Sequence, residues 1–551
     1  MKPFHFLAAG CAALFLAACG GDGEGAGRDA ARTDAASPLE AEFRLSGAEP
    51  MDIDALFALM PADARPTYES AEFDDRLGAT VVTNLRFADE DDGEAVVVER
   101  AEFYGVDMEA VARVRAAAEA GPDAPFETLF QKVRLLNIAS EGLEDEDAAV
   151  LLTVAGVEFD VLKVRRGGLE GDGAGDEGAR AANAIDLGGL YFKDIELTSK
   201  TAETPSVSFA APDLRFVSIA GGRLGAVIAN DVSYEFRHTD RSIGALREAM
   251  GPQGAMVFDG PLRNFIAPDN QRTQVKTFEW RDIDFSGLLA WGLRGEEPPL
   301  TAENLIDLGT FRAVDMVSYI GEKRAATVKE TTMSAGAFTW MAPSDIRLDT
   351  KGAVYDFTAY IDAGEEEALN ILADNGLDRV AGDGFLQWRW NSDRGDAALD
   401  YEMSTDGLAD FSMGAAFSGL KLNEMAAADE AGEENALIDL GRLDRFSMEV
   451  ADEKLLDVFF AFSALQMGGT GEDLRQSVPA MIRIGGMQAA QLNARFADYV
   501  DAVADFVGKG GALTIEAAPG EPVGFAGLQE AGQSAPQTLP DLLDLTVTHT
   551  E

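Results

Sequence analysis

The sequence predicts a β-rich α+β protein, with large twisted antiparallel sheets built from repeated strand units and a helical insert in the C-terminal quarter. Three observations predict this fold class. Many segments alternate apolar and polar residues, one motif recurs three times, and three helical segments follow one another after residue 451. Alternation is typical of strands that bury one face, whereas helices repeat apolar residues every three or four positions.

The N-terminus has the pattern of an export signal. Lys2 gives a positive start, and residues 4–18 form an apolar run that is short for crossing a bilayer. The run ends in Leu16-Ala17-Ala18-Cys19, which resembles the lipobox of bacterial lipoproteins. That resemblance implies a lipoprotein signal peptide at 1–18, acylation of Cys19 and, because Gly20 follows, sorting to the outer membrane, facing the periplasm. An ordinary secretory signal cut at an Ala-x-Ala-like site is the alternative.

Residues 19–40 are predicted to form a disordered tether. They are rich in Gly, Ala, Asp and Ser and have too little apolar bulk to offset the entropy of ordering. A flexible chain of about twenty residues reaches roughly 25 Å, enough to hold a folded body clear of lipid headgroups. Cys11 lies inside the signal peptide, so an acylated mature chain keeps no thiol for a disulfide. The membrane is therefore the expected partner, through the lipid anchor.

The charge balance narrows the partner classes. There are 45 Lys and Arg against 96 Asp and Glu, a net charge of −51. Nucleic-acid binding is excluded, because it rests on basic residues that neutralise phosphates. We attribute the acidity to solubility and keep calcium binding by some acidic clusters as the alternative. The acidic stretch at 88–99 does not fit an EF-hand, because Ala88 would occupy the first ligand position.

One motif, Ile-Asp-Leu-Gly, occurs in three similar segments, Asn183 to Leu197, Asn304 to Val317 and Asn435 to Val450. Their separation is far longer than a solenoid unit, so duplicated domains or half-domains fit better than a stacked array. The predicted units after the tether are an N-terminal β-rich unit at 41–180, a first repeat at 181–300, a second repeat at 301–430, and a third unit with helices and final strands at 431–551.

The repeated acids are Asp186, Asp307 and Asp439. Ile and Leu flank each acid with a period of two, which places the apolar pair on one face of a strand and the acid on the other. The glycine then breaks the alternation, as a bulge or sharp bend would. We expect a structural role for these acids. The alternative is that they face a common groove.

The remaining elements follow from periodicity and end signals. Thr470 with Asp473 has the pattern of a helix N-terminal cap, and an apolar stripe from Leu492 to Val507 is expected to pack on neighbouring elements. Alternating segments lie at 79–88, 95–106, 223–236, 277–285, 352–361 and 398–420, helices at 107–122, 240–252 and 364–380, and the helical insert at 452–469, 470–486 and 487–511.

The order of elements from residue 352 resembles a family of exported Gram-negative proteins that carry a domain of unknown function. The segments in question are "FLQWRWNSDRGDAALDYEMSTDGLADFSMGAAFSGL", "GGALTIEAAPGEPVGFAGL" and "PDLLDLTVTHTE". The resemblance implies a β-rich envelope protein with repeated strand units. It implies no activity and no functional residue.

Candidate catalytic and cofactor motifs are weak. Past the signal peptide only His238 and His549 are available, and no G-x-S-x-G occurs. Ser418 and Lys421 match S-x-x-K without its partner motifs, and "GAGDEG" at 173–178 is flanked by acids that would repel a pyrophosphate. Trp388 and Trp390 share one strand parity and are expected to pack, with an aromatic binding surface as the alternative. We therefore assign no catalytic, cofactor or metal residue.

These observations predict a non-enzymatic binding or envelope-assembly factor, for lipid or another apolar ligand or for an envelope protein. The lipid part rests on fold-level analogy. The alternative is a hydrolase that uses carboxylates, directed at glycans. A lipid-binding protein should have an apolar groove, whereas a hydrolase should have carboxylates that converge in a polar pocket with perturbed pKa values.

Overall fold

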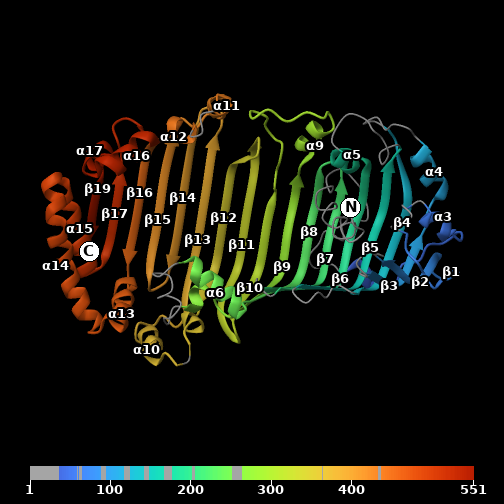
Figure 1. The fold of residues 1–551 in the computed structure, drawn as a ribbon, viewed down its shortest axis with the longest axis horizontal. Helices are drawn as coiled ribbons and strands as arrows, with labels where there is room; N and C mark the ends of the chain where they lie inside the picture. Colours follow the sequence, from blue (N-terminus) through green and yellow to red (C-terminus); the bar gives the residue numbers. More distant parts are fainter. Residues whose placement is uncertain are drawn as a thin grey trace. The chain divides into compact units, whose positions relative to one another are not determined.

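The computed structural model describes residues 36–551 apart from 59, 61–64, 89–94, 117–123, 142–147, 167–176, 202–204, 251–262, 363 and 432–435. The signal peptide, Cys19, most of the tether, half of the acidic stretch at 88–99 and most of the "GAGDEG" motif therefore lie outside the described residues. Two compact units are present, and Figure 1 labels the helices and strands of both. The first holds the described residues up to Ala249, with Asp269–Pro299 and Asn304–Val314, and the second holds the described parts of 250–268, Leu300–Glu303 and Asp315–Glu551.

The first unit is an antiparallel meander in which each strand pairs with the next along the chain. Six of its strands have 15 to 18 residues, longer than most strands in globular proteins. The strands are β1 (Ser70–Asp74), β2 (Ala79–Ala88), β3 (Ala95–Tyr104), β4 (Phe126–Glu141), β5 (Ala148–Arg165), β6 (Ile185–Thr201), β7 (Ser206–Ala220), β8 (Arg223–Arg237) and β9 (Asn270–Asp284). Its short helices are η1 (Pro38–Glu40), α3 (Ile53–Phe57), α4 (Met108–Ala116), α5 (Glu177–Ala184), α6 (Asp240–Ala249) and α9 (Ser286–Gly292).

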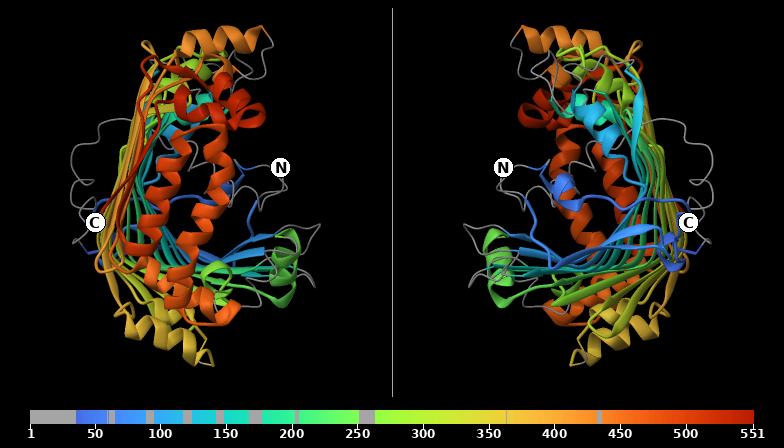
Figure 2. Two further views of the ribbon diagram at one scale, coloured as in Figure 1. Left: turned by 90° about the vertical axis from the view of Figure 1, so that its left-hand side faces the viewer. Right: turned by 90° about the vertical axis from the view of Figure 1, so that its right-hand side faces the viewer.

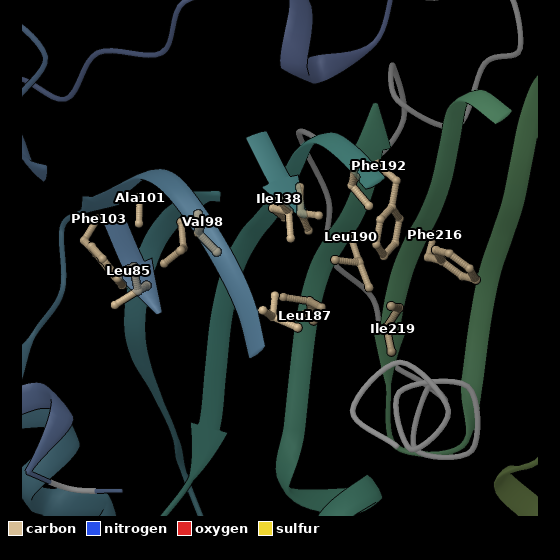
Figure 3. Packing of buried hydrophobic residues seen from close by; sticks show 14 of the residues in the cluster. Leu85, Val98, Ala101, Phe103, Ile138, Leu187, Leu190, Phe192, Phe216 and Ile219 are labelled. Atoms are coloured by element: carbon tan, nitrogen blue, oxygen red, sulfur yellow. The ribbon is translucent and has the colours of Figure 1, made fainter. Parts of the chain in front are cut away.

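Both faces of this sheet are buried in its central part. The larger core cluster lies on one face and includes the side chains of β2, β3, β4, β6 and β7 labelled in Figure 3. On the opposite face Tyr191 and Ile228 are buried beside Leu39, and Tyr104 is buried beside Phe43 and Leu45. The N-terminal segment Ser37–Leu45 therefore covers part of the second face.

The strands of the first unit turn sharply part-way along their length (Figure 2). Two rows of opposed residues cross the meander. At both rows alternate strands carry a residue with positive φ, and the second row ends in two such residues side by side, Asp282 and Gly309. The register is the same on both sides of each row, so these are matched kinks and contain no inserted residue. The first bend row is Asn84, Glu99, Asn137, Ala155, Asp194, Pro212, Asp231 and Lys276, and the second bend row is Gly105, Gln131, Val161, Gly188, Ser218, Gly225, Asp282 and Gly309.

The kinks suit the residues that occupy them. Asn and Asp tolerate the left-handed region better than other non-glycine residues, and Asn84, Asn137, Asp194 and Asp231 have φ between 46° and 54°. Each kink also shifts the inward-facing positions by one residue, so apolar residues three apart both face the core. These pairs are Val82 and Leu85, Val98 and Ala101, Leu187 and Leu190, Phe192 and Ile195, Phe216 and Ile219, and Leu224 and Val227.

The second unit is also an antiparallel meander, from β11 to β17, with β19 beside β17 and β18 beside β16. Its strands are β11 (Lys323–Thr339), β12 (Ala342–Tyr355), β13 (Val380–Asn391), β14 (Asp396–Thr405), β15 (Ala409–Ser418), β16 (Arg442–Asp452), β17 (Gly511–Ala517), β18 (Val523–Gly524) and β19 (Thr546–Thr550). Strand β10 (Thr310–Ile320) begins in the first unit and ends in the second.

The helices of the second unit gather mainly after β16. They are α8 (Arg263–Ile266), η3 (Phe357–Tyr360), α10 (Glu366–Asp374), α11 (Leu422–Glu430), α12 (Ala436–Leu440), α13 (Leu455–Met467), α14 (Gly471–Leu492), α15 (Arg495–Lys509), α16 (Phe525–Ser534), η4 (Pro536–Thr538) and α17 (Leu539–Leu542). The predicted fold class is therefore confirmed: antiparallel sheet dominates, and three long helices lie in the C-terminal quarter. The predicted repeat boundaries at 180, 300 and 430 stay a prediction from sequence similarity.

Two boundaries of the predicted elements are wrong. The helix expected to end at Gly486 continues to Leu492. Gly486 lies inside it as a packing position, since a Cβ there would lie 2.3 Å from Val500 Cγ2 of α15. Leu492 ends α14, is 69% exposed and does not belong to the packed stripe of α15. The strand expected at 352–361 ends at Tyr355, where Asp356 caps the 3-10 helix η3 by accepting from the Thr358 amide at 3.1 Å.

Candidate functional site

An apolar cavity of about 420 Å³ lies in the first unit, in the size range of small-molecule sites. Among the lining residues that the structure describes, nine are apolar, one is Arg115, and none is a carboxylate. The lining comes from α3, β3, the start of the β3–α4 connection, α4, β4 and β5. It consists of Leu56, Phe103, Val106, Val111, Val114, Arg115, Leu129, Phe130, Val133 and Leu162, and we call this set the apolar cavity.

The second bend row passes through the apolar cavity. Val106 follows Gly105, Phe130 precedes Gln131, and Leu162 follows Val161. Gly105 has φ +59°, and a Cβ at this position would lie 2.9 Å from Gln131 Cγ, so the two strands approach closely there. The kinks turn the strands at the cavity, and the residues on both sides of the row line it.

An irregularity in β4 places two consecutive side chains in the cavity. The β4–β5 register shifts between Thr128 and Phe130, so Leu129 departs from the regular ladder. In a regular strand neighbouring side chains point to opposite faces. With the bulge, Leu129 and Phe130 both line the cavity.

Helix α4 is fixed over the cavity by polar contacts at its start and on its outer side. The Asp107 carboxylate accepts from the Ala110 amide at 2.8 Å, and the Asp107 amide donates to the Leu129 carbonyl at 2.9 Å. Arg113 donates to Glu127 of β4 at 3.1 Å. The hydrogen bond from Arg113, and then the one from Arg166, lowers the pKa of Glu127. Val111, Val114 and Arg115 are the residues of α4 that line the cavity.

The opposite face of the sheet carries a buried ion cluster, formed by Lys132, Arg134, Glu158 and Asp160. Glu158 is fully buried and is paired with Lys132 and, at 2.7 Å, with Arg134. Lys132 also reaches Asp160 at 3.1 Å, and Arg134 donates to the Pro38 carbonyl at 3.1 Å. Its charges are mutually paired beneath the segment Ser37–Leu45, as buried charges generally are. We therefore assign the buried ion cluster a structural role.

Two tyrosines border the buried ion cluster. Burial raises the pKa of Tyr191, and the nearby Asp160 and Glu158 add to the shift. Burial also raises the pKa of Tyr104, which donates to Glu102 at 2.7 Å. Both phenols therefore stay protonated over the physiological range and act as hydrogen-bonding or packing groups.

A charged cavity of about 860 Å³ lies among α13, α14 and α15 of the second unit. Two of its described carboxylates are ion-paired: Arg475 contacts Asp457, and Arg483 and Lys509 contact Asp505 at 2.5 Å and 3.2 Å. A third, Glu472, accepts from the Gln476 amide at 3.2 Å. The hydrogen bond from Lys509 lowers the pKa of Asp505. A general acid requires a raised pKa, so this arrangement favours charge pairing over acid catalysis.

The repeated acids occupy separate places. Asp186 lies on β6, opposite in direction to the core-facing Ile185 and Leu187, and accepts from Lys163 at 3.0 Å. Asp307 forms a bridge with Asp284 of β9, so β7, β8 and β9 lie between it and Asp186. Neither acid faces a groove shared with the other, and both have backbone or ion-pair contacts that fit the structural role expected of them.

Asp439 departs from the strand prediction, because it lies in the helix α12. Strand β15 ends at Ser418, and Gly419 follows with φ +77°, so the residues before Arg442 lack a ladder partner there. Their backbone groups are satisfied in a helical turn instead, where the Gly441 amide donates to the Leu437 carbonyl at 3.0 Å. Asp439 lines a small cavity of about 310 Å³ with residues of α16.

The weak catalytic motifs do not assemble into sites. Ser418 donates to Asp444 at 2.6 Å, whereas Lys421 contacts Glu424 at 2.8 Å. The His549 Nε2 atom lies 2.7 Å from the Gly510 carbonyl oxygen. The His238 Nδ1 atom lies 3.3 Å from the Ser242 hydroxyl.

Trp388 and Trp390 are both half-buried on β13, and the Trp390 indole donates to the Leu420 carbonyl at 2.9 Å. In the described part of the chain, no group of three or more His, Cys, Asp or Glu side chains is placed to hold a metal ion.

The sequence reasoning missed the apolar cavity. The available signal was the adjacent apolar pair Leu129 and Phe130, which breaks the alternation of β4 and marks the bulge. Among the described residues, none of the helices has both the length and the apolar content that crossing a membrane requires.

Residues 402–550 match the sequence model of a family described as an uncharacterised protein. The matched region begins within β14 and ends in β19, inside the stretch that resembles a domain of unknown function, and it brings no activity with it. No curated protein matches the chain.

Proposed function

We propose that the chain is a non-enzymatic binding protein of the cell envelope that holds an apolar ligand in the apolar cavity of its first unit. The composition of that cavity carries the proposal. Nine apolar side chains line about 420 Å³, and the described part of the lining contains no carboxylate. Apolar linings with few polar groups are typical of sites that bury most of a small ligand.

The same observation favours binding over hydrolysis. A glycan hydrolase needs two carboxyl groups across the scissile bond, one with a raised pKa. In the charged cavity of the second unit, Asp457 and Asp505 are paired with cations, and the pKa of Asp505 is lowered. The carboxylate-based envelope hydrolase therefore has less support than the binding protein.

We place the protein at the outer membrane, facing the periplasm and held by lipid on Cys19. The support is the motif Leu16-Ala17-Ala18-Cys19 at the end of an apolar run. Acyl chains anchor a protein because each buried CH₂ contributes about 0.8 kcal/mol, so several chains hold it almost permanently. Labelled palmitate should enter the chain and not the Cys19→Ser variant, which should leave the membrane fraction. Retention of the label by Cys19→Ser would contradict the anchor.

The ligand proposal is tested by filling the cavity. The double variant Val111→Trp and Leu129→Trp places two indoles in it, and Leu151→Trp, at an exposed position of β5, is the matched control. Lipids that co-purify with the full chain are measured by mass spectrometry. We expect the double variant to lose the bound lipid at least tenfold relative to the control, which corresponds to about 1.4 kcal/mol. Equal recovery from both variants, or no lipid from the native chain even after addition, would overturn the proposal.

A further inference from the structure

Helix α14 carries the most exposed apolar side chains of the described chain. Among the large apolar residues that the structure describes, the five with the greatest exposure all lie on α13 and α14. Four of them belong to α14, namely Met481, Ile484, Met487 and Leu492, and are 57–69% exposed. Their spacing places them on one side of the helix, opposite Gly486, where α15 packs against α14 (Figure 1).

The exposed side of α14 carries no charge over its last four turns. Arg483 is the one charged residue from Gln476 to Leu492, although 26% of the residues in the chain are charged. Its guanidinium contacts Asp501 at 3.0 Å and Asp505 at 2.5 Å, so it belongs to the side that faces α15. At 1.5 Å per residue, the uncharged side is about 24 Å long. We call the following exposed residues the neutral face of α14: Met481, Ile484, Gly485, Met487, Gln488 and Leu492.

Gly485, near the middle of the neutral face, has no packing role within the described chain. A Cβ at Gly485 would meet nothing within 4 Å outside its own part of the helix, whereas a Cβ at Gly486 would lie 2.3 Å from Val500. Glycine destabilises an exposed helix interior relative to alanine. The distance between two packed helices depends on the side chains at their contact, so a helix that crosses α14 at Gly485 can approach closely.

The charge of the chain decides which occupant the neutral face suits. With 96 acidic against 45 basic residues, two copies repel each other wherever charged surfaces meet. A two-fold contact brings one patch against its own copy, and an uncharged patch avoids this repulsion. A basic protein would gain by meeting acids, and helices that lie on a bilayer carry Lys and Arg on their polar side. The neutral face offers neither acids nor cations, which favours a second copy of the chain.

We infer that the neutral face of α14 is the contact between two copies of this chain, which cross as antiparallel helices at Gly485 about a two-fold axis. Met481 of one copy then lies near Leu492 of the other, and Ile484 is buried at the centre. A contact made by one helix from each copy is small, so the expected dissociation constant is on the order of micromolar. This inference does not depend on the ligand of the apolar cavity.

The first test measures the mass of the full chain by sedimentation equilibrium in a density-matched detergent. We expect a dimer that dissociates on dilution. Ile484→Glu should raise the dissociation constant at least about a hundredfold, because both copies carry the new charge at the contact. Leu437→Glu is the matched control, since Leu437 of α12 is 56% exposed against 64% for Ile484, and it should leave the dissociation constant unchanged.

The second test traps the contact by mild oxidation of the full chain in lipid vesicles. Gly485→Cys should form disulfide-linked dimers at least about tenfold faster than Asp498→Cys, at an exposed position of α15, because the contact holds the two thiols together. The native chain gives the background from Cys11 and Cys19. A native chain that stays monomeric far above micromolar concentration, equal effects of the two Glu variants, or equal trapping at both positions would overturn the inference. Loss of vesicle binding by Ile484→Glu without a change in mass would assign the face to a bilayer and overturn it as well.

Discussion

Removing the carboxylate at the centre of the buried ion cluster should open β4 and β5. Glu158 is fully buried and is the shared partner of Lys132 and Arg134. Replacing it with Leu keeps most of the volume and removes the charge. Lys132 and Arg134, each 7% exposed, would then remain buried without their carboxylate.

The size of the destabilisation depends on the partners that Lys132 and Arg134 keep after Glu158 is replaced. Breaking a buried pair by removing one partner costs about 3–5 kcal/mol, because the remaining charge is uncompensated. Lys132 retains Asp160 at 3.1 Å, whereas Arg134 retains only the Pro38 carbonyl. With one of the two cations still paired, we expect the lower end, about 3 kcal/mol, for Glu158→Leu.

Hydrogen exchange of peptides from β4 and β5 measures this free energy of opening locally. At about 3 kcal/mol, exchange should accelerate on the order of a hundredfold. The triple variant with Lys132→Met, Arg134→Met and Glu158→Leu serves as the control. It leaves no buried charge among the three positions, and replacing such a group by apolar residues is often neutral. Protection of Glu158→Leu within about 1 kcal/mol of the native chain, or a triple variant no better protected than the single one, would refute the reasoning.

Three further predictions concern the bends and α4. Gly309→Ala should destabilise the first unit by more than about 2 kcal/mol, and by more than Gly188→Ala does. Gly309 has φ +59°, and its Cβ would lie 1.9 Å from the Arg281 carbonyl, against 3.2 Å from the Asp160 carbonyl for Gly188. Urea unfolding measures both variants, and the reverse order of stability would contradict this account. Val161→Asn should stabilise by about 1 kcal/mol, because Val161 has φ 35° and Asn tolerates this region better; a lower melting temperature would argue against it. Arg113 lowers the pKa of Glu127, so their contact stabilises the packing of α4 on β4 above the ordinary pKa of 4.5, and this stabilisation is lost as pH falls through the lowered pKa. Hydrogen exchange of α4, corrected for intrinsic rates, should therefore rise at acid pH in the native chain. The Glu127→Gln variant should show no such pH dependence.

The alternation of apolar and polar residues predicted much of the sheet. The positions where this alternation is interrupted also mark the kinks, and the prediction used this signal only at the repeated glycine. The glycine of the first repeat was expected to mark a bend, and Gly188 lies on the second bend row. The same signal is present wherever two core residues stand three apart around an Asn, Asp, Ser or Gly, as Phe216 and Ile219 do around Ser218. A strict period of two treats these sites as defects, whereas each is a kink that keeps the apolar residues on one face.

The apolar cavity could not be predicted from local pattern, because its lining comes from six places along the chain. Leu56 and Leu162 lie more than a hundred residues apart in the sequence, and only the order of strands brings them together. Asp439 shows the opposite failure: its motif turns helical, whereas the identical first copy lies in strand β6 and the second forms an isolated bridge at Asp307. Strand β15 ends at Ser418, so the segment before Arg442 has no neighbouring strand to pair with. Its backbone groups form hydrogen bonds within the helical turn of α12 instead.

The bend and the cavity have a common physical origin. A row of kinks interrupts the ladder in every strand it crosses, and the side chains on its two sides project in different directions. In the first unit this row runs from Gly105 through Gln131 and Val161 to Gly188, and the apolar cavity lies at its beginning, where α4 covers it. Gly188, the glycine of the first Ile-Asp-Leu-Gly motif, therefore lies on the same bend row that shapes the cavity. If the cavity binds its ligand as proposed, a substitution that straightens this row should weaken binding without touching a lining residue.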